Sequence, residues 1–271
     1  MRPLSTTVRT ELRFEAARPL GAGLVVALAR RPGVQVRSEA LAVTGSTGAV
    51  PVREVQLPDG GRLHEFTAPA GATTVVYRAT ATTDPAAVDD GLRASERWEF
   101  TRPSRFCPSD RLTRTAAAEF GRVPRADLPR AVAAWVGART GYVSGSSLPT
   151  DGALETLLDR RGVCRDFAHL TAALLRALDV PARVAAAYAP GLPTDDFHAV
   201  VEAAPQGRWE VVDATGLAPR PALLRIAAGR DAADTAFLTT TGEVALTHLS
   251  VRAVTDGVLP ADDHLGAVVL A

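Results

Sequence analysis

One short segment carries the strongest chemical signal in this sequence. The run from Arg161 to Leu170 places Cys164 where a glycine turn passes into an apolar helix. A thiol at a helix start lies near unpaired backbone N–H groups and the positive end of the helix dipole. Both favour the thiolate, the nucleophilic form of cysteine, and the same N–H groups can later hold an oxyanion. We therefore predict that Cys164 is a nucleophile.

Two later segments supply a base and a partner for that base. His198 follows a polar turn and begins an apolar strand, and Asp213 lies on the next predicted strand. A carboxylate on a buried strand keeps its charge only when it is paired, and the imidazole N–H of His198 is a suitable partner. Cys164, His198 and Asp213 thus follow the nucleophile–base–orienter order of acyl chemistry through a thiolate.

Two other residues fit this chemistry less well. His169 follows Cys164 in the same helix and lies about 140° around it, off the face of the sulfur. We expect it to be structural or to support the site by hydrogen bonding. Cys107 lies between Phe106 and Pro108 with no histidine nearby, so we expect it to be structural. A lone cysteine is usually a small buried hydrophobe, so the prediction depends on the three motifs together.

The composition bounds the class of protein. Of 271 residues, 46% are hydrophobic and 22% charged, as is typical of a globular protein with a buried core. The 30 basic and 30 acidic residues cancel, which gives no electrostatic case for binding nucleic acid or an anionic membrane. The sequence has no zinc-type cysteine or histidine spacing, no P-loop and no G-x-G-x-x-G. We expect neither a metal nor a cofactor.

The N-terminal region indicates the compartment. Its first apolar run, Leu24–Ala29, is far shorter than the about 20 residues that span a bilayer. It also lacks the ordered regions of a signal peptide. Cys107 and Cys164 could form a disulfide, but nothing else indicates an oxidising compartment. We expect a cytoplasmic protein with reduced thiols.

The first hundred residues have strand patterns. From Thr6 to Phe14 the even positions are apolar or threonine, while Arg9, Glu11 and Arg13 take odd positions, as in a strand with one buried face. We therefore predict an antiparallel β-domain over residues 1–100. Prolines interrupt the pattern over 101–120, which we interpret as a connector. The further predicted strands are Leu24–Ala29, Val34–Val43, Val50–Leu57 and Thr73–Thr82.

Residues 121–271 are predicted to form an α+β core. Apolar spacing predicts a helix around Leu128–Val136, and Thr150 is a candidate N-cap for a short helix that Gly162 ends. The helix that begins at Cys164 has an apolar stripe wide enough to be buried on most sides, and Asp179–Pro181 ends it. The strands predicted here are Ala182–Ala189, Phe197–Ala204, Trp209–Thr215 and Thr247–Val254.

These motifs resemble the bacterial transglutaminase-like superfamily, a papain-related fold with a G-x-C-x-D-[FY]-A helix, an H-A-W strand and a D-P-T strand. The resemblance implies that Cys164 is the nucleophile, His198 the base and Asp213 the orienter. It also implies a helix bearing the cysteine packed on an antiparallel sheet, preceded by the β-domain of many bacterial members. The three signature segments match at Gly162–Ala168, His198–Val200 and Asp213–Thr215. Val180–Arg183 is similar to the family's I-P-A-R segment. Two more stretches, Gly229–Asp234 and Pro103–Asp110, are also similar to segments of bacterial members.

Two positions depart from the family pattern. Val200 replaces the usual tryptophan after His-Ala, and Ala214 replaces the proline after the aspartate. Neither change removes a catalytic atom. The missing tryptophan alters a wall of the acyl site and so bears on the substrate more than on activity.

The resemblance implies a cysteine enzyme that attacks a carboxamide or peptide carbonyl. Passing the thioester to water gives a protease or amidase, and passing it to an amine gives an acyltransferase; the sequence leaves both open. The acidic pair Asp195 and Asp196 either attracts a cationic acceptor or is merely solvated. The alternatives are a non-catalytic peptide- or partner-binding module and an arylamine-type acetyltransferase using coenzyme A, which the flanking segments disfavour. We expect a peptide or protein substrate, and the oligomeric state is open.

Overall fold

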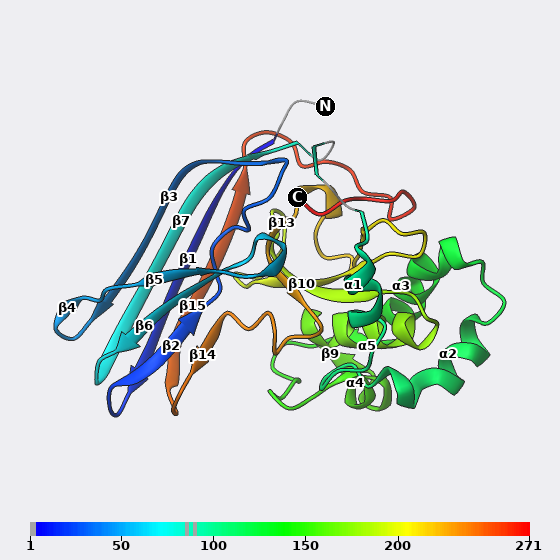
Figure 1. The fold of residues 1–271 in the computed structure, drawn as a ribbon, viewed down its shortest axis with the longest axis horizontal. Helices are drawn as coiled ribbons and strands as arrows, with labels where there is room; N and C mark the ends of the chain where they lie inside the picture. The colour runs from blue at the N-terminus through cyan, green and yellow to red at the C-terminus, as the bar shows by residue number, and fades with distance from the viewer. Residues whose placement is uncertain (1–3, 85–86, 89–90) are drawn as a thin grey trace.

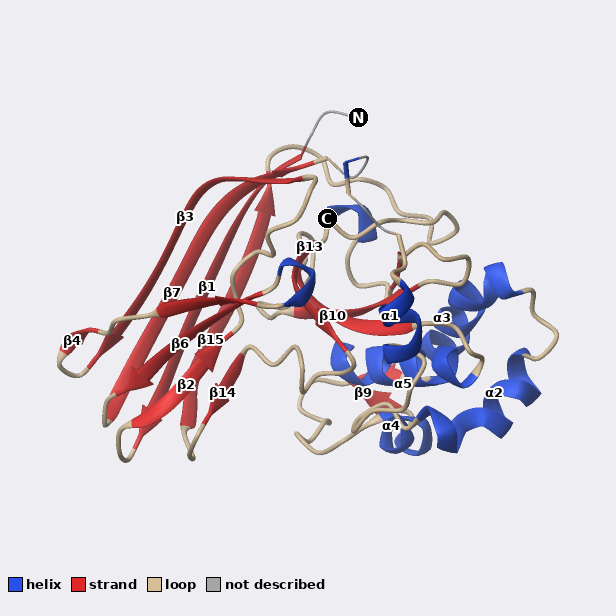
Figure 2. Cartoon of the chain, viewed as in Figure 1, coloured by secondary structure: helices blue, strands red, loops and turns tan. Residues whose placement is uncertain are grey.

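The structure is a computed structural model that describes residues 4–84, 87–88 and 91–271. Figures 1 and 2 show a β-rich part on the left and a mixed helix and sheet part on the right. The β-rich part has two antiparallel sheets with strand orders β15–β1–β7–β3–β4 and β14–β2–β6–β5. Its elements are β1 (Leu4–Ala16), β2 (Leu20–Leu24), β3 (Val34–Gly45), β4 (Gly48–Ala49), β5 (Arg53–Gln56), the 3₁₀ turn Pro58–Gly60, β6 (Arg62–Ala68), β7 (Gly71–Thr83), β14 (Leu238–Thr240) and β15 (Ala245–Thr255).

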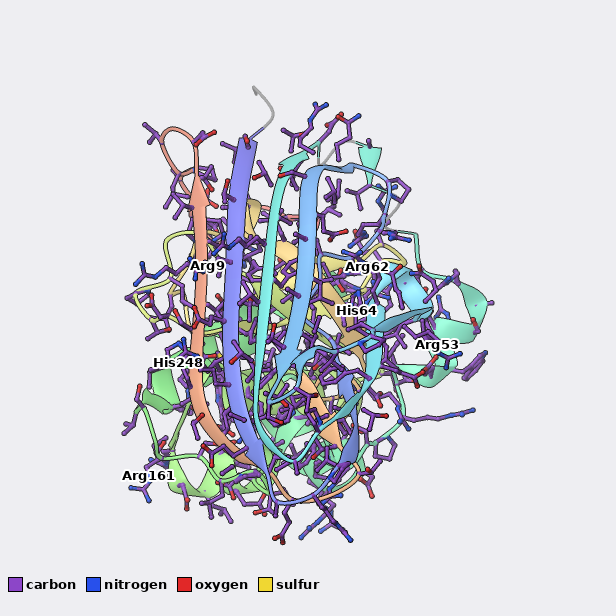
Figure 3. The ribbon with its side chains drawn as sticks, turned by 90° about the vertical axis from the view of Figure 1, so that its left-hand side faces the viewer. Arg9, Arg53, Arg62, His64, Arg161 and His248 are labelled. Carbon is purple, nitrogen blue, oxygen red and sulfur yellow. The ribbon has the colours of Figure 1, made fainter. Side chains whose placement is uncertain are left out.

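The alternation predicted for the first strand is confirmed. The even residues from Thr6 to Phe14 are buried, while Arg9 and Arg13 are exposed. Figure 3 shows the outer side of this sheet, with β15, β1, β7 and β3 side by side. Its inner apolar side chains pack against those of the second sheet, such as Phe66, and together they form one core.

The right-hand part places one long buried helix against a four-stranded antiparallel sheet of order β12–β11–β10–β13. Apolar residues of this helix, α5 (Cys164–Ala177), share a core with Val184 and Val201 of the sheet. The mixed fold class and the predicted helix at Cys164 are confirmed. The elements are α1 (Ala94–Glu99), α2 (Thr113–Phe120), α3 (Leu128–Arg139), β8 (Gly141–Tyr142), α4 (Ala153–Asp159), β9 (Arg161–Gly162), α5 (Cys164–Ala177), β10 (Ala182–Tyr188), β11 (His198–Ala203), β12 (Glu210–Val212), β13 (Leu224–Gly229) and the 3₁₀ turns Ser109–Leu112, Arg125–Asp127 and Arg220–Ala222.

The strand predicted over Thr247–Val254 exists, but its assignment to the α+β core is wrong. It lies in β15 and pairs antiparallel with β1, from Thr6 opposite Thr255 to Glu15 opposite Ala245. The shorter β14 likewise pairs with β2. The chain therefore returns to the β-rich part after the core, so residues 121–271 do not form one separate body. A period-two pattern predicts a strand and its buried face, but it carries no information on the partner strand.

The apolar run Leu24–Ala29 is a strand only at Leu24, where β2 ends. The rest is a buried connection between the two parts. The Val25 N–H donates to the Phe237 carbonyl at 3.0 Å, and the Ala29 N–H donates to the Arg225 carbonyl at 2.9 Å. Its apolar character comes from burial between the two parts rather than from a sheet. In the core, the short helix α4 begins after Gly152 rather than at Thr150, and β13 was not predicted.

Candidate active site

Cys164 is the first residue of α5, and the residues around it hold it there. The Asp166 carboxylate accepts a 2.7 Å hydrogen bond from the Val163 N–H and a 2.9 Å bond from the Ser147 hydroxyl. Gly162 leaves room for this carboxylate, because a Cβ there would lie 2.5 Å from the Asp166 Cβ. The glycine, cysteine and aspartate of the G-x-C-x-D pattern thus together place the thiol at the helix N-terminus.

Replacing Asp166 with alanine should destabilise the protein. The substitution leaves the Val163 N–H without its acceptor and removes a partner of Ser147, which we expect to cost about 1–2 kcal/mol of unfolding free energy. Asp166→Asn keeps one acceptor oxygen and should cost less. Urea unfolding of the three proteins checks this order, and equal stabilities would show that the cap does not hold the start of α5.

His198 and Asp213 come together at the ends of neighbouring strands. His198 is the first residue of β11, and Asp213 directly follows β12, which pairs with β11. The two side chains are buried and share a hydrogen bond of 2.7 Å between Nε2 of His198 and Oδ2 of Asp213. The other carboxylate oxygen accepts the backbone N–H of Thr215 at 2.8 Å and its hydroxyl at 2.7 Å. Both carboxylate oxygens are therefore occupied, which fixes the orientation of the imidazole.

The electrostatics of this pair favour two opposite charges. Burial lowers the pKa of His198, but side-chain interactions with Asp213 and Cys164 outweigh it and raise that pKa to about 10. Burial raises the pKa of Asp213, and its hydrogen bonds with His198 and Thr215 bring it below the usual value. The remaining ring nitrogen, Nδ1 of His198, is buried and makes no hydrogen bond of standard geometry with the described residues. Cys164 nevertheless lies near enough to the ring to raise its pKa.

Cys164 and His198 line the same cavity, which has a volume of about 390 Å³. The thiol also contacts the carbonyl oxygen of Phe197, at 3.8 Å. Most of the remaining lining is apolar and comes from segments far apart in the chain, and no local sequence signal marks these residues. Besides Cys164 and His198, the polar lining residues include Ser147, Arg165 and Asp196. The apolar lining residues include Val25, Ala186, Phe197, Ile226, Phe237 and Leu238.

Tyr142 is a further residue near the thiol that sequence analysis did not identify. β8 and β9 pair in parallel, with Tyr142 opposite Gly162, two residues before Cys164. The Tyr142 hydroxyl lies near enough to Cys164 for this residue to influence the pKa of Tyr142. Burial raises the pKa of Tyr142 to about 12, so the hydroxyl keeps its proton at neutral pH.

His169 and Cys107 lie outside this cavity, in agreement with the structural roles expected for them. His169 is fully buried, accepts the Ala232 N–H at 3.1 Å and stacks on Phe106. Burial lowers its pKa to about 3, so it is neutral at pH 7. Burial raises the pKa of Cys107 to about 12, which keeps this thiol protonated. The two cysteines are not bonded to each other.

Metal sites and membrane-spanning helices are both absent from the part of the chain that the structure describes. No group of three histidine, cysteine, aspartate or glutamate side chains there could hold a metal ion. None of the described helices is both long and apolar enough to cross a membrane.

Comparison with known proteins identifies the family. A model of the transglutaminase-like superfamily matches residues 111–214, the segment that holds Cys164, His198 and Asp213. The fold is similar to the crystal structure of a candidate cysteine protease from Cytophaga hutchinsonii, with a TM-score of 0.87 and 30% identity over 98% of this chain and 96% of that one. An uncharacterized protein of Mycobacterium leprae is 29% identical over 154 residues. That match covers 52% of this chain and 53% of the relative, so the chain spans about half the length of the curated relative.

The similarity to the Cytophaga structure extends over both the β-rich part and the core, and the family model covers the helix and strands that place the thiol, imidazole and carboxylate. This protein therefore belongs to the transglutaminase-like superfamily.

Proposed function

We propose that this protein is a cysteine-dependent enzyme that cleaves a carboxamide or peptide bond through a thioester on Cys164. One observation carries the proposal: Cys164 at the start of α5 and the Asp213-bonded His198 line one cavity. The similarity to a candidate cysteine protease supports a peptide or protein substrate.

The geometry suggests the following steps. The Cys164 thiolate attacks the carbonyl carbon, and the carbonyl electron pair moves to oxygen. N–H groups at the start of α5 are the donors for that oxyanion. The His198 imidazolium gives its proton to the leaving nitrogen, the C–N bond breaks and a thioester remains. Water or an amine then attacks the thioester while His198 accepts its proton, and the thiolate departs.

Of the two acceptors, we propose water. The cavity walls beside the thiol are mainly apolar, and the similar Cytophaga protein is described as a candidate protease. Val200, at the position of the family tryptophan, is buried and offers no polar group to orient an amine.

Alkylation by iodoacetamide tests whether the thiol is activated. At pH 7 the wild-type Cys164 should react rapidly, and His198→Ala should slow the reaction by about 10²-fold or more, because the imidazolium that stabilises the thiolate is gone. His248→Ala is the matched control, since His248 is an exposed residue of β15 on the outer face (Figure 3). Peptide mapping identifies the labelled cysteine. Equally slow labelling in all three proteins would favour the non-catalytic binding module.

We also propose that the protein acts in the cytoplasm. Its two thiols are unpaired, which suits a reducing compartment. Fractionation of the host cell with antibody detection tests this, and recovery of the protein outside the cytoplasm would contradict it.

A further inference from the structure

A second cavity adjoins the candidate active site on the β-rich part. It has a volume of about 820 Å³ and lies along the sheet of β14, β2, β6 and β5. Val25 and Ala236 line both this cavity and the one that contains Cys164. The two cavities are therefore neighbours that share a wall, one at the thiol and one on the β-rich part.

Two glycines of β2, Gly21 and Gly23, lie on the face of the sheet that lines the second cavity. Gly23 pairs with Glu65 on one side and Thr239 on the other, so these three residues share one face. A Cβ on Gly23 would lie 3.0 Å from Leu63 Cδ1, and one on Gly21 would lie within 3.3 Å of Thr241. Leu63 and Thr241 therefore cover these two positions, and the glycines let both side chains pack close to the sheet.

The lining of this cavity indicates the kind of group it accepts. Pro51, Val52, Leu57 and Leu63 provide apolar walls. Three charged groups also line it, and each is paired: Arg53 with Glu65, and Asp234 with Arg230. An apolar, uncharged side chain fits such a cavity better than an ion does.

A strand edge connects the two cavities. In the ladder between β14 and β2, the Phe237 carbonyl accepts from the Val25 N–H, and the Thr241 N–H donates to the Gly21 carbonyl. The backbone groups of the odd-numbered residues on this side therefore bond to β2. The backbone groups of Leu238 and Thr240 consequently point to the other edge of β14. Among the described residues no strand pairs with that edge. Leu238 lines the Cys164 cavity, and residues 239–241 line the second.

We propose that the substrate is an extended polypeptide that binds along the free edge of β14. Its reacting carbonyl lies at Cys164, and an apolar side chain farther along the same strand occupies the second cavity. Main-chain hydrogen bonds with a strand edge, together with a pocket for a side chain, are a general mode of peptide binding. This inference rests on the proposed function.

The test compares short and long cysteine-directed probes. One pair consists of vinyl sulfones with one or four residues on the acyl side, and another of epoxysuccinyl amides with one or four residues on the leaving side. Each long probe carries leucine at the distal positions. The readout is the ratio of long-probe to short-probe labelling rates at Cys164, so any general change in thiol reactivity cancels.

In the wild type, at least one pair should give a ratio of about 10–100, the gain expected from burying a leucine side chain. Thr239→Trp, which fills the second cavity from the shared face, should bring that ratio close to one. Thr7→Trp, on an exposed position of β1, should keep the wild-type ratio.

The failures can be told apart. Rapid labelling by iodoacetamide and the short probes, with no advantage for either long probe, would overturn the extended-substrate proposal alone. An advantage that persists in Thr239→Trp would also overturn it. If iodoacetamide and every probe label Cys164 only as slowly as an ordinary thiol, both this inference and the proposed function fail.

Discussion

Cys164→Ala is expected to abolish acyl-enzyme formation, with turnover falling by about 10⁶-fold, the loss found when the nucleophile of a catalytic triad is removed. The physical reason is that, among the described residues that line the cavity with His198, Cys164 carries the only thiol. Ser147 also lines the cavity, but its hydroxyl donates to Asp166 at 2.9 Å and accepts from Arg165 at 2.6 Å. Both hydrogen bonds tie this hydroxyl to the start of α5, so it is not free to attack a substrate.

The measurement is intact-mass spectrometry after incubation with a glutamine-containing peptide, with and without a primary amine. The wild type should show the mass of an acyl group, mapped to Cys164. Cys107→Ala is the matched control and should still form the adduct, because Cys107 is buried with a protonated thiol. Release of free acid in the presence of the amine would support hydrolysis, while incorporation of the amine would contradict the choice of water. A broad panel of amides, peptides and thioesters that never modified Cys164 would instead support the binding module.

The candidate residues could be predicted because each lies at the end of a local element. Cys164 begins a helix whose apolar stripe is visible in the sequence, and His198 begins a strand after a polar turn. The structure brings His198 into hydrogen-bond contact with Asp213. The catalytic roles of the three residues stay predictions that the labelling experiments test.

The cavity walls could not be predicted, because they depend on contacts between distant segments. Val25 reaches the site only because the buried connection after β2 bonds to Phe237. Ile226 comes from β13, whose short apolar pattern was not recognised as a strand. The pairing of β14 and β15 with strands of the β-rich part could not be predicted for the same reason. Which strands pair depends on how whole sheets pack, and local alternation does not reveal it.

Asp213→Asn is expected to lower the pKa of His198 and to reduce turnover by about 10²–10⁴-fold, because the carboxylate both orients the imidazole and stabilises its cation. With ¹³C-labelled histidine, the Cε1 signal of His198 reports its charge directly. The wild-type signal should stay in the cationic state well above pH 6.5, and that of the variant should titrate at a lower pH. The signal is assigned by its disappearance in His198→Ala. Identical titrations would show that Asp213 does not set the charge of the imidazole.

The same ion pair should make stability depend on pH. The pKa of His198 lies above its ordinary 6.5, so the contribution of the pair is fully present below about pH 6.5 and is lost as the pH rises toward about 10. The pKa of Asp213 lies below its ordinary 3.8, so the contribution is present above about pH 4 and is lost as the pH falls through that lowered pKa. The difference in unfolding free energy between wild type and Asp213→Asn should therefore be widest between about pH 4 and 6.5. Urea unfolding at about pH 5, 8 and 10 measures it. A difference that stayed constant up to pH 10 would mean that His198 is not held as a cation in the folded protein, and His198 would then lack the proton that the leaving nitrogen needs.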